Sequence, residues 1–148
     1  MFAVRDMKLS DKEQVLSMVE EFYQSDAVDH AISKEIRERS FEAAAGTSPM
    51  IRGIVLVEEE QIVGYAYLTP FYTCEAGGVN LMIEELFLKD VCRGKGYGTK
   101  FFQWMFREYP DVVRFRLEVT AANEGAAALY KKLGFEYLDY RQMVLDRL

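Results

Sequence analysis

The sequence predicts a mixed α/β protein in which most strands of one sheet run antiparallel. Two β-rich arms, residues 51–57 and 62–72, flank a short charged turn, which is the pattern of an antiparallel hairpin. A strand, a glycine-rich turn, a helix and a second strand then follow one another between residues 79 and 119, which is the pattern of a parallel βαβ unit. A sheet that contains both units is mixed and not doubly wound.

The N-terminal part predicts a short strand over residues 2–7 and two helices. Ser10 is expected to cap a helix over 11–24, with a glutamate three residues later that completes a capping box. Ser33 is expected to cap a second helix that runs to about residue 45. The apolar positions that recur at helical spacing in the first of these helices are Val15, Met18, Val19 and Phe22.

The remaining elements follow from the same rules. Pro110 ends the helix after the glycine turn, and Gly134 is a natural residue to follow the last helix. The tail over 135–147 is expected to form one or two strands. The expected elements of this half are a strand at 79–88, a helix at 97–109, a strand at 112–119 and a helix from Asn123 to about 133.

The composition bounds the class of protein. The chain has 148 residues, of which 50% are hydrophobic, so we expect one folded domain over 1–148. A formal charge of −6 disfavours nucleic acid as a partner and favours a cationic substrate. No run approaches the roughly 18 apolar residues that a membrane helix needs, and the N-terminus lacks the pattern of a signal peptide. We therefore expect a cytoplasmic protein with no membrane partner.

Cysteines and metal ligands give no sign of a metal centre. Cys74 and Cys92 have neither metal-site spacing nor the pattern of a disulfide framework. The chain contains one histidine that could activate a thiol, so ordinary free thiols are expected. We expect no metal.

The glycine turn, "RGKGYG" at residues 93–98, indicates that backbone comes close to an anionic ligand. Its G-x-G-x-G spacing differs from the G-x-G-x-x-G of dinucleotide-binding folds. The Walker sequence G-K-[ST] is also absent, because Gly98 is followed by Thr99 and Lys100 in the opposite order. Both nucleotide interpretations are therefore weak.

A third pattern, R-x-x-G-x-G, fits from Arg93 to Gly98. It lies between the acidic strand "IEELFL" at 83–88 and the helix "NEGAAALYKKLGF" at 123–135. In this order the three segments resemble the GNAT N-acetyltransferase superfamily, which binds acetyl-coenzyme A. The resemblance implies a GNAT-like fold: a mostly antiparallel sheet, about four helices, and a parallel pair, 79–88 and 112–119, that splays at a bulge. The stretch around "IEELFL" is more similar to the polyamine and small-amine branch.

The resemblance implies a coenzyme site. Backbone N–H groups of the loop would surround the pyrophosphate, the strand backbone would pair with the pantetheine arm, and Asn123 would bind that arm from the other side. Small residues of the last helix would let it pass close to the coenzyme. The residues implied for the coenzyme are Leu86, Phe87, Leu88, Arg93, Gly94, Lys95, Gly96, Tyr97, Gly98, Thr99, Asn123, Ala127 and Tyr130.

The resemblance also implies acid and base residues. An alkyl ammonium must lose a proton before it attacks the thioester, and the thiolate that leaves must be protonated. Tyr130 matches the general acid, and Glu84 matches the acidic residue that faces the acceptor as base or ammonium anchor, with Glu85 as the reserve candidate. His30 and Tyr23 are candidates for the acceptor pocket.

The function expected from these residues is acetyl transfer from acetyl-coenzyme A to a primary amine of a small molecule, by direct attack in a ternary complex. Two alternatives stay open: a protein or peptide amine as acceptor, and a non-catalytic acyl-coenzyme A-binding regulatory module. A homodimer is a further expectation. The sequence does not name the acceptor.

Overall fold

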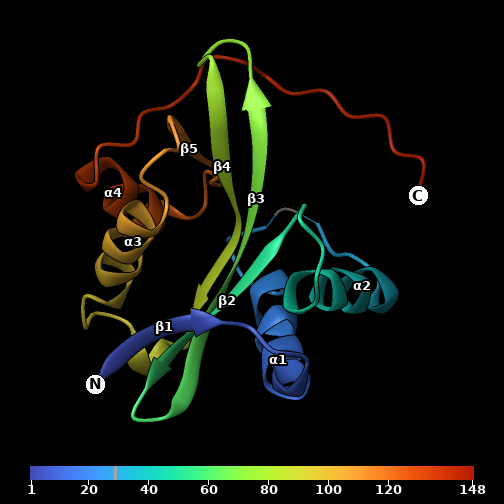
Figure 1. Cartoon of the computed structure of the whole chain (residues 1–148), viewed down its shortest axis with the longest axis vertical. Coiled ribbons are helices and arrows are strands. Elements are labelled where there is room, and N and C mark those ends of the chain that lie inside the picture. Colours follow the sequence, from blue (N-terminus) through green and yellow to red (C-terminus); the bar gives the residue numbers. More distant parts are fainter. Residues whose placement is uncertain (29) are drawn as a thin grey trace.

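The computed structural model describes residues 1–28 and 30–148, and it contains a five-stranded sheet with helices on both faces (Figure 1). The strand order is β1-β2-β3-β4-β5, and every neighbouring pair is antiparallel except β4 and β5, which are parallel. The mixed sheet predicted from the sequence is confirmed. The strands are β1 Phe2–Asp6, β2 Arg52–Glu58, β3 Gln61–Thr73, β4 Gly78–Leu88 and β5 Arg114–Leu117.

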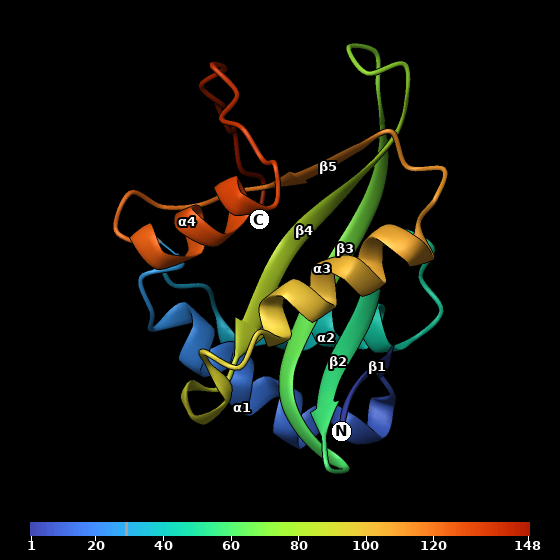
Figure 2. The same cartoon turned by 90° about the vertical axis from the view of Figure 1, so that its left-hand side faces the viewer.

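The helices α1 and α2 lie on one face of the sheet, and α3 and α4 lie on the other (Figures 1 and 2). Each face has its own apolar core. One core contains the predicted apolar positions of α1 with aromatic residues of β3, and the other packs the phenylalanines of α3 against the opposite side of the strands. The helices are α1 Lys12–Tyr23, α2 Lys34–Ala45, α3 Tyr97–Glu108 and α4 Glu124–Lys132, with short 3₁₀ turns at Leu9–Asp11 and Asp90–Cys92.

The cap of α1 differs from the prediction. Ser10 lies inside the 3₁₀ turn, and Asp11 is the residue that precedes α1. The Asp11 carboxylate accepts the Lys8 backbone N–H at 2.8 Å and two hydrogen bonds from Arg5, at 2.9 and 3.1 Å. The Asp11 side chain makes no capping hydrogen bond to α1, because its carboxylate is directed toward Lys8 and Arg5. The cap of α2 is confirmed, because the Ser33 hydroxyl accepts the N–H of Ile36 at 3.2 Å.

A β-bulge lies in the middle of β4. Tyr67 of β3 is opposite Glu85, and the next residue of β3, Leu68, is opposite Ile83. Glu84 is therefore one extra residue on β4 without a partner in register. A bulge bends its strand and changes the direction in which side chains point. The bulge expected in this strand is confirmed.

The parallel pair is short and its strands diverge. The ladder joins Asn80–Ile83 of β4 to Arg114–Leu117 of β5 and stops there, so β5 is shorter than the predicted strand over 112–119. Beyond this point β5 turns toward α4, and β4 continues along β3 (Figure 2). The residues from Glu84 to Leu88 therefore have a neighbouring strand on the β3 side alone.

The prediction of strands in the tail is wrong. No strand lies in residues 133–148, all of which are described, and the segment runs outward to end on the side of α2 (Figure 1). Its large apolar side chains from Tyr137 onward are exposed, with Met143 at 97% and Leu148 at 96%, whereas Leu133 and Phe135 pack on the core. Residues with a high β propensity form a strand only when a neighbouring backbone pairs with them. In this structure the tail has no such neighbour.

Candidate active site

The glycine loop leads directly into α3 and leaves the start of that helix open. Gly94 and Gly96 have φ angles of 77° and 78°, a region that residues with a Cβ rarely adopt. Gly96 precedes the helix, and no side chain caps its first turn. The first N–H groups of a helix have no partner within the helix and carry a partial positive charge. This end of α3 therefore suits a phosphate.

The two cations of the loop have different roles. Arg93 ties the loop to the end of β4, since its Nε donates to the Leu88 carbonyl at 3.1 Å and its guanidinium pairs with Asp90 at 2.9 Å. The Lys95 ammonium lies 3.3 Å from a carboxylate oxygen of Glu58. The hydrogen bond of Glu58 with Tyr97, together with Lys95, lowers the pKa of Glu58.

A groove of about 880 Å³ runs from the glycine loop along the free side of β4 to the start of α4. It contains the strand residues, the loop and one face of α4, as the coenzyme interpretation requires. The predicted coenzyme residues that line it are Leu86, Phe87, Leu88, Arg93, Gly94, Gly96, Tyr97, Gly98, Thr99, Asn123 and Tyr130.

Two predicted coenzyme residues lie outside this groove. Lys95 points toward Glu58, and Ala127 lines a different cavity, whereas its neighbour Ala126 lines the groove. Consecutive helical residues point about 100° apart, so Ala126 and Ala127 face different directions. The side-chain oxygen of Asn123 accepts the N–H of Ala126 at 3.4 Å, which caps α4 and fixes Asn123 at the groove.

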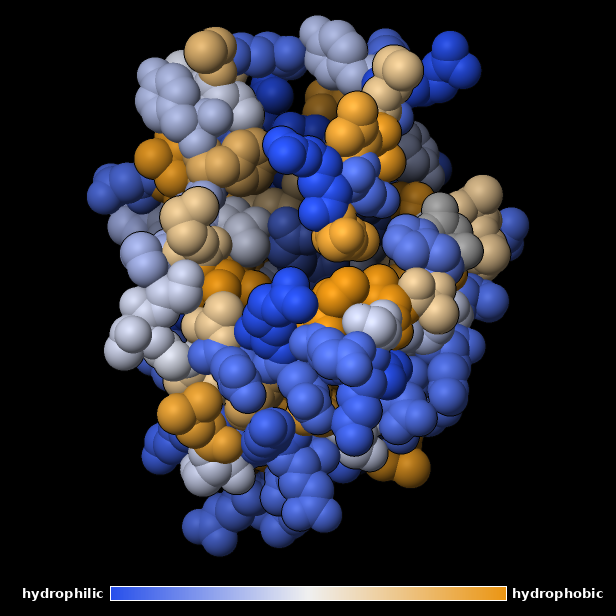
Figure 3. All heavy atoms as spheres, turned by 90° about the vertical axis from the view of Figure 1, so that its right-hand side faces the viewer, coloured by the Kyte–Doolittle hydropathy of each residue, from blue (hydrophilic) through white to orange (hydrophobic). Residues whose placement is uncertain are grey.

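A second cavity, of about 470 Å³, adjoins the groove and is called the acidic cavity below. Glu84, Glu85 and Glu118 line it, together with Tyr23 and His30. Apolar side chains of α1, β4 and β5 form much of the rest of its wall. On the side of the molecule where α1 and α2 lie, the surface is hollowed near its centre, and hydrophobic groups border the hollow (Figure 3).

The groove and the acidic cavity meet where β4 and β5 diverge. Tyr130, from α4, lines both, and burial raises the pKa of its hydroxyl. This phenol therefore stays protonated and able to donate at neutral pH. The residues common to both cavities are Phe22, Ala27, Leu86, Asn123 and Tyr130.

Glu85 is the inner of the two consecutive glutamates. The Tyr23 hydroxyl donates to its Oε2 at 2.6 Å, and the Tyr65 hydroxyl donates to its Oε1 at 2.7 Å. Burial raises the pKa of Glu85, and the two phenolic hydrogen bonds act in the opposite direction without cancelling the effect. Burial and the neighbouring carboxylate raise the pKa of both tyrosines, so both remain donors.

Glu84 has a more exposed setting at the bulge. Its Oε1 accepts a hydrogen bond from the Thr69 hydroxyl at 3.0 Å. The adjacent residues Glu84 and Glu85 would face opposite sides of a regular strand, but the bulge allows both to line one cavity.

Tyr65 and Glu118 are not among the site residues predicted from the sequence. Tyr65 belongs to a strand in which seven consecutive residues, Ile62–Leu68, are buried, so nothing in its pattern separates it from the core. Glu118 follows β5, and the alternation of charged and apolar residues there offered a signal of which residues share a face. Only the tertiary structure shows which of the alternating residues near β5 face a cavity.

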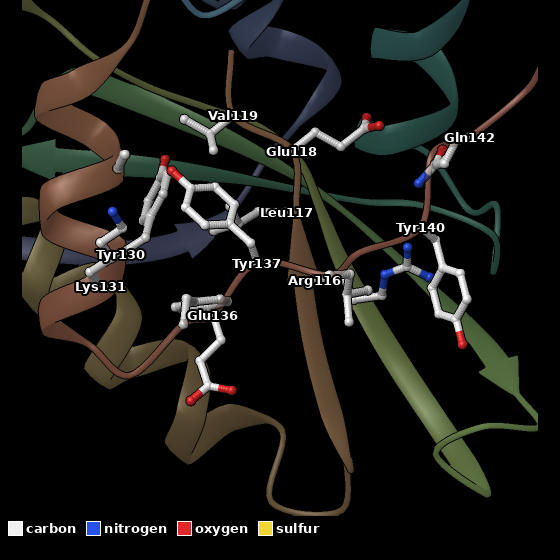
Figure 4. Close-up of a pocket in the computed structure, with 13 residues that line it drawn as sticks. Arg116, Leu117, Glu118, Val119, Tyr130, Lys131, Glu136, Tyr137, Tyr140 and Gln142 are labelled. Carbon is white, nitrogen blue, oxygen red and sulfur yellow. The ribbon is translucent and has the colours of Figure 1, made fainter. Parts of the chain in front are cut away.

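A third cavity, of about 370 Å³, lies between β5, α4 and the C-terminal segment (Figure 4). Tyr130 reaches it as well, and its side chain and that of Tyr137 point toward one another (Figure 4). The Lys131 ammonium lies 5.1 Å from the centre of the Tyr137 ring. The cavity therefore extends from the Tyr130 side chain to the exposed C-terminal segment.

No group of three or more histidine, cysteine, aspartate or glutamate side chains arranged for a metal ion occurs among residues 1–28 and 30–148. The described helices include none that is long and apolar enough to cross a membrane. Cys74 is an exposed free thiol and Cys92 a buried one.

Comparison with protein families identifies the chain. Residues 14–135 match the family model of the acetyltransferase (GNAT) family, so the chain belongs to this family. The resemblance found in the sequence is confirmed at this level; the narrower small-amine branch stays a prediction. A search of curated protein sequences found no significant match.

Solved structures share the fold. A possible acetyltransferase from Clostridium difficile 630 has a TM-score of 0.82 at 16% identity, over 100% of this chain and 99% of that one. A predicted acetyltransferase from Clostridium acetobutylicum, solved with acetyl-coenzyme A, has a TM-score of 0.78 at 17% identity, over 98% and 96%. An aminoglycoside N-acetyltransferase in complex with coenzyme A has a TM-score of 0.78 at 11% identity, over 100% and 96%. The chain therefore has the fold of acetyltransferases that bind coenzyme A.

Proposed function

We propose that the protein transfers an acetyl group from acetyl-coenzyme A to a primary amine of a small molecule, by direct attack in a ternary complex. One observation carries the proposal: the groove below the glycine loop and the acidic cavity meet at Tyr130. A donor held in the groove and an amine held in the acidic cavity would bring their reacting atoms to this junction.

The residues of the groove fit the coenzyme. The open first turn of α3 and the glycine loop offer backbone N–H groups for a pyrophosphate. The free side of β4 from Glu84 to Leu88 offers backbone for an extended amide chain, in the manner of an added strand. When bound, acetyl-coenzyme A supplies the activated acetyl group.

The chain's own residues would handle the protons. The substrate ammonium gives one proton to a carboxylate of the acidic cavity. The neutral nitrogen then forms a bond to the acetyl carbon while the bond from that carbon to sulfur breaks. Tyr130 would give its proton to the departing sulfur and would regain one from the surplus proton of the new amide nitrogen. The proton on the carboxylate would pass to solvent, so one proton in all is released. General acid and base catalysis of this kind contributes about 10²–10⁴-fold.

The charge of the acidic cavity supports an amine acceptor. Glu84, Glu85 and Glu118 line it, and no lysine or arginine is among the described lining residues. Clustered carboxylates attract a cation and raise its local concentration. We assign Glu84 and Glu85 to the base and ammonium-anchor roles, and His30 and Tyr23 to acceptor binding. The small-molecule acceptor is supported by the size of the cavity, about 470 Å³, and by the similar fold of an aminoglycoside N-acetyltransferase.

An acceptor screen tests the proposal. Release of free thiol from acetyl-coenzyme A would be followed across polyamines, amino acids, aminoglycosides and peptides. We expect at least one small amine to raise the rate well above hydrolysis. If peptides alone do so, the acceptor is a protein amine; if coenzyme A binds and no amine has an effect, the protein is a binding module. A cytoplasmic location and a homodimer stay predictions.

A further inference from the structure

The two oxygens of Glu85 are held from two different elements. Tyr23 reaches Oε2 from the last residue of α1, and Tyr65 reaches Oε1 from β3, with distances of 2.6 and 2.7 Å. A carboxylate accepts hydrogen bonds and a phenol donates them, so this arrangement suits the ionised form of Glu85. Two short bonds from opposite sides also fix the plane of the carboxylate.

We propose that Glu85, rather than Glu84, is the base that deprotonates the acceptor, and that Tyr23 and Tyr65 are positioning residues that hold it. This inference rests on the proposed acetylation of an amine. It goes beyond that proposal because it separates the roles of the two consecutive glutamates and includes Tyr65, which does not line the acidic cavity.

The geometry allows the base to work while it stays held. A carboxylate has about four lone-pair sites, and the two phenols occupy one site on each oxygen. The remaining sites are available to a substrate, since Glu85 lines the acidic cavity. In the step itself an N–H bond of the ammonium breaks, an O–H bond forms on Glu85, and the electron pair stays on nitrogen. Water later removes this proton.

Tyr23 and Tyr65 differ in burial, and this difference indicates separate functions for the two phenols. Tyr65 is 0% exposed and stacks on Phe87 with ring centres 6.1 Å apart, so its hydroxyl is fixed by the core. Tyr23 is half-buried and lines the cavity itself. We therefore assign Tyr65 to holding Glu85 alone, and Tyr23 to holding Glu85 and forming the wall against which the acceptor lies.

Other ionisable groups surround this carboxylate, and they bear on its protonation. A negative Glu84 beside Glu85 disfavours its ionised form, as does burial, whereas the two phenols favour it. Arg37 acts on Tyr23 from α2. The ionisable groups that face the cavity or the carboxylate are Tyr23, His30, Arg37, Tyr65, Tyr67, Glu84, Glu118 and Tyr130.

The chain contains a matched control for Tyr65. Tyr67 lies two residues along the same strand, is 2% exposed, and its ring centre is 5.2 Å from that of Tyr65. Its buried hydroxyl has no hydrogen-bond partner among the described residues. Tyr65→Phe and Tyr67→Phe therefore each remove one buried hydroxyl near Glu85, but only the first removes a bond to the carboxylate.

The first test is the pH dependence of kcat/KM for an active acceptor. Loss of a hydrogen bond to a charged group weakens the ionised form, so Tyr65→Phe should move the acid limb to higher pH by about one pH unit. Tyr67→Phe should leave its midpoint in place, and Glu85→Gln should abolish the limb. Coenzyme A affinity should stay close to wild type for Tyr65→Phe, because Tyr65 does not line the groove.

The second test does not depend on activity. The protein labelled with ¹³C at its glutamate carboxyls would be titrated by NMR, with Glu85→Gln used to assign the Glu85 signal. We expect a midpoint above the ordinary glutamate value in wild type, a higher midpoint in Tyr65→Phe, and no change in Tyr67→Phe. An unchanged midpoint in Tyr65→Phe overturns the positioning role. A Glu85→Gln variant with the wild-type pH profile overturns Glu85 as base. A wild type that acetylates no amine rejects the proposed function by itself, since the NMR result is unaffected.

Discussion

Glu84 and Glu85 follow one another in β4, and both line the acidic cavity because Glu84 is the extra residue of a β-bulge. Their surroundings differ in a way that a regular strand would not produce. Glu85 is enclosed by two phenolic hydroxyls, whereas Glu84 is exposed and accepts one hydrogen bond from Thr69. The bulge therefore gives two identical side chains separate chemical settings at the place where the strands diverge.

Replacement of Glu84 should affect binding of the acceptor more than the chemical step. We expect Glu84→Gln to raise KM for a cationic acceptor about 1.4–5-fold, because an exposed ion pair contributes about 0.2–1 kcal/mol. The value of kcat should change little, and the midpoint of the acid limb should move to lower pH, because the negative charge of Glu84 raises the pKa of Glu85. Steady-state kinetics from pH 5 to 9 would check this, and loss of the acid limb in Glu84→Gln would transfer the base role to Glu84.

Removal of the Tyr130 hydroxyl should slow turnover and leave coenzyme binding intact. For Tyr130→Phe we expect kcat to fall about 10²-fold, the lower end of the range for general acid catalysis. Calorimetric titration with coenzyme A should give a Kd within a factor of about three of wild type, as the ring stays in place. Tyr72→Phe is the control, since Tyr72 is 66% exposed near the far end of β3. A Tyr130→Phe enzyme with wild-type turnover would exclude the acid role.

Substitutions at two glycines distinguish the effect of backbone strain on stability from an effect on ligand binding. Gly96 before α3 and Gly77 in the β3–β4 hairpin have φ angles of 78° and 67°, and an added Cβ would meet no atom within 4 Å at either. We expect Gly96→Ala and Gly77→Ala each to lower the free energy of unfolding by about 1–2 kcal/mol. Only Gly96→Ala should also weaken coenzyme A binding, because it displaces the N–H groups at the start of α3. Equal Kd values for the two variants would contradict the phosphate role of the loop.

Asp11 should stabilise the N-terminal region in a pH-dependent manner. Burial acts to raise the pKa of Asp11, but hydrogen bonds from Arg5 and the Lys8 N–H outweigh it and leave that pKa lowered. Its contribution is therefore present above the unfolded pKa near 3.8 and is lost as pH falls through the lower folded value. Urea unfolding of Asp11→Asn should show a loss of about 1–2 kcal/mol at pH 7 and almost none near pH 2.

Ser10→Ala is the control for this measurement. Ser10 lies beside Asp11 in the 3₁₀ turn, and its hydroxyl does not cap α1. We expect its free energy of unfolding to stay within about 0.5 kcal/mol of wild type at both pH values. If the free energy of unfolding falls more in Ser10→Ala than in Asp11→Asn, the predicted role of Ser10 as the cap of α1 is supported.

Local patterns predicted the elements and their order. The spacing of Val15, Met18, Val19 and Phe22 predicted the buried face of α1, and all four are buried. The glycine spacing predicted an anion site at the start of α3, and the structure has an open helix start there. These features depend on a few neighbouring residues, so they can be seen in the sequence.

The tail shows where local patterns fail. The residues after Gly134 are rich in aromatic and aliphatic side chains, but a strand exists only when another backbone pairs with it, and no such partner adjoins residues 133–148. In the same way, serine three residues before a glutamate is a common cap, yet the approach of Arg5 from β1 favours Asp11. At the cap the deciding partner belongs to another element, and in the tail the pairing strand is lacking in the fold.

The sequence by itself determined the family, the order of the elements, the glycine loop and the pair of glutamates, because each depends on residues close together in the chain. Only the tertiary structure decided that the extra residue of β4 lets the side chains of Glu84 and Glu85 line the same cavity. It also decided that hydroxyls 62 and 20 residues away enclose one of them. Burial and hydrogen bonding set the chemistry of a carboxylate, and both come from residues that the fold brings together over these distances.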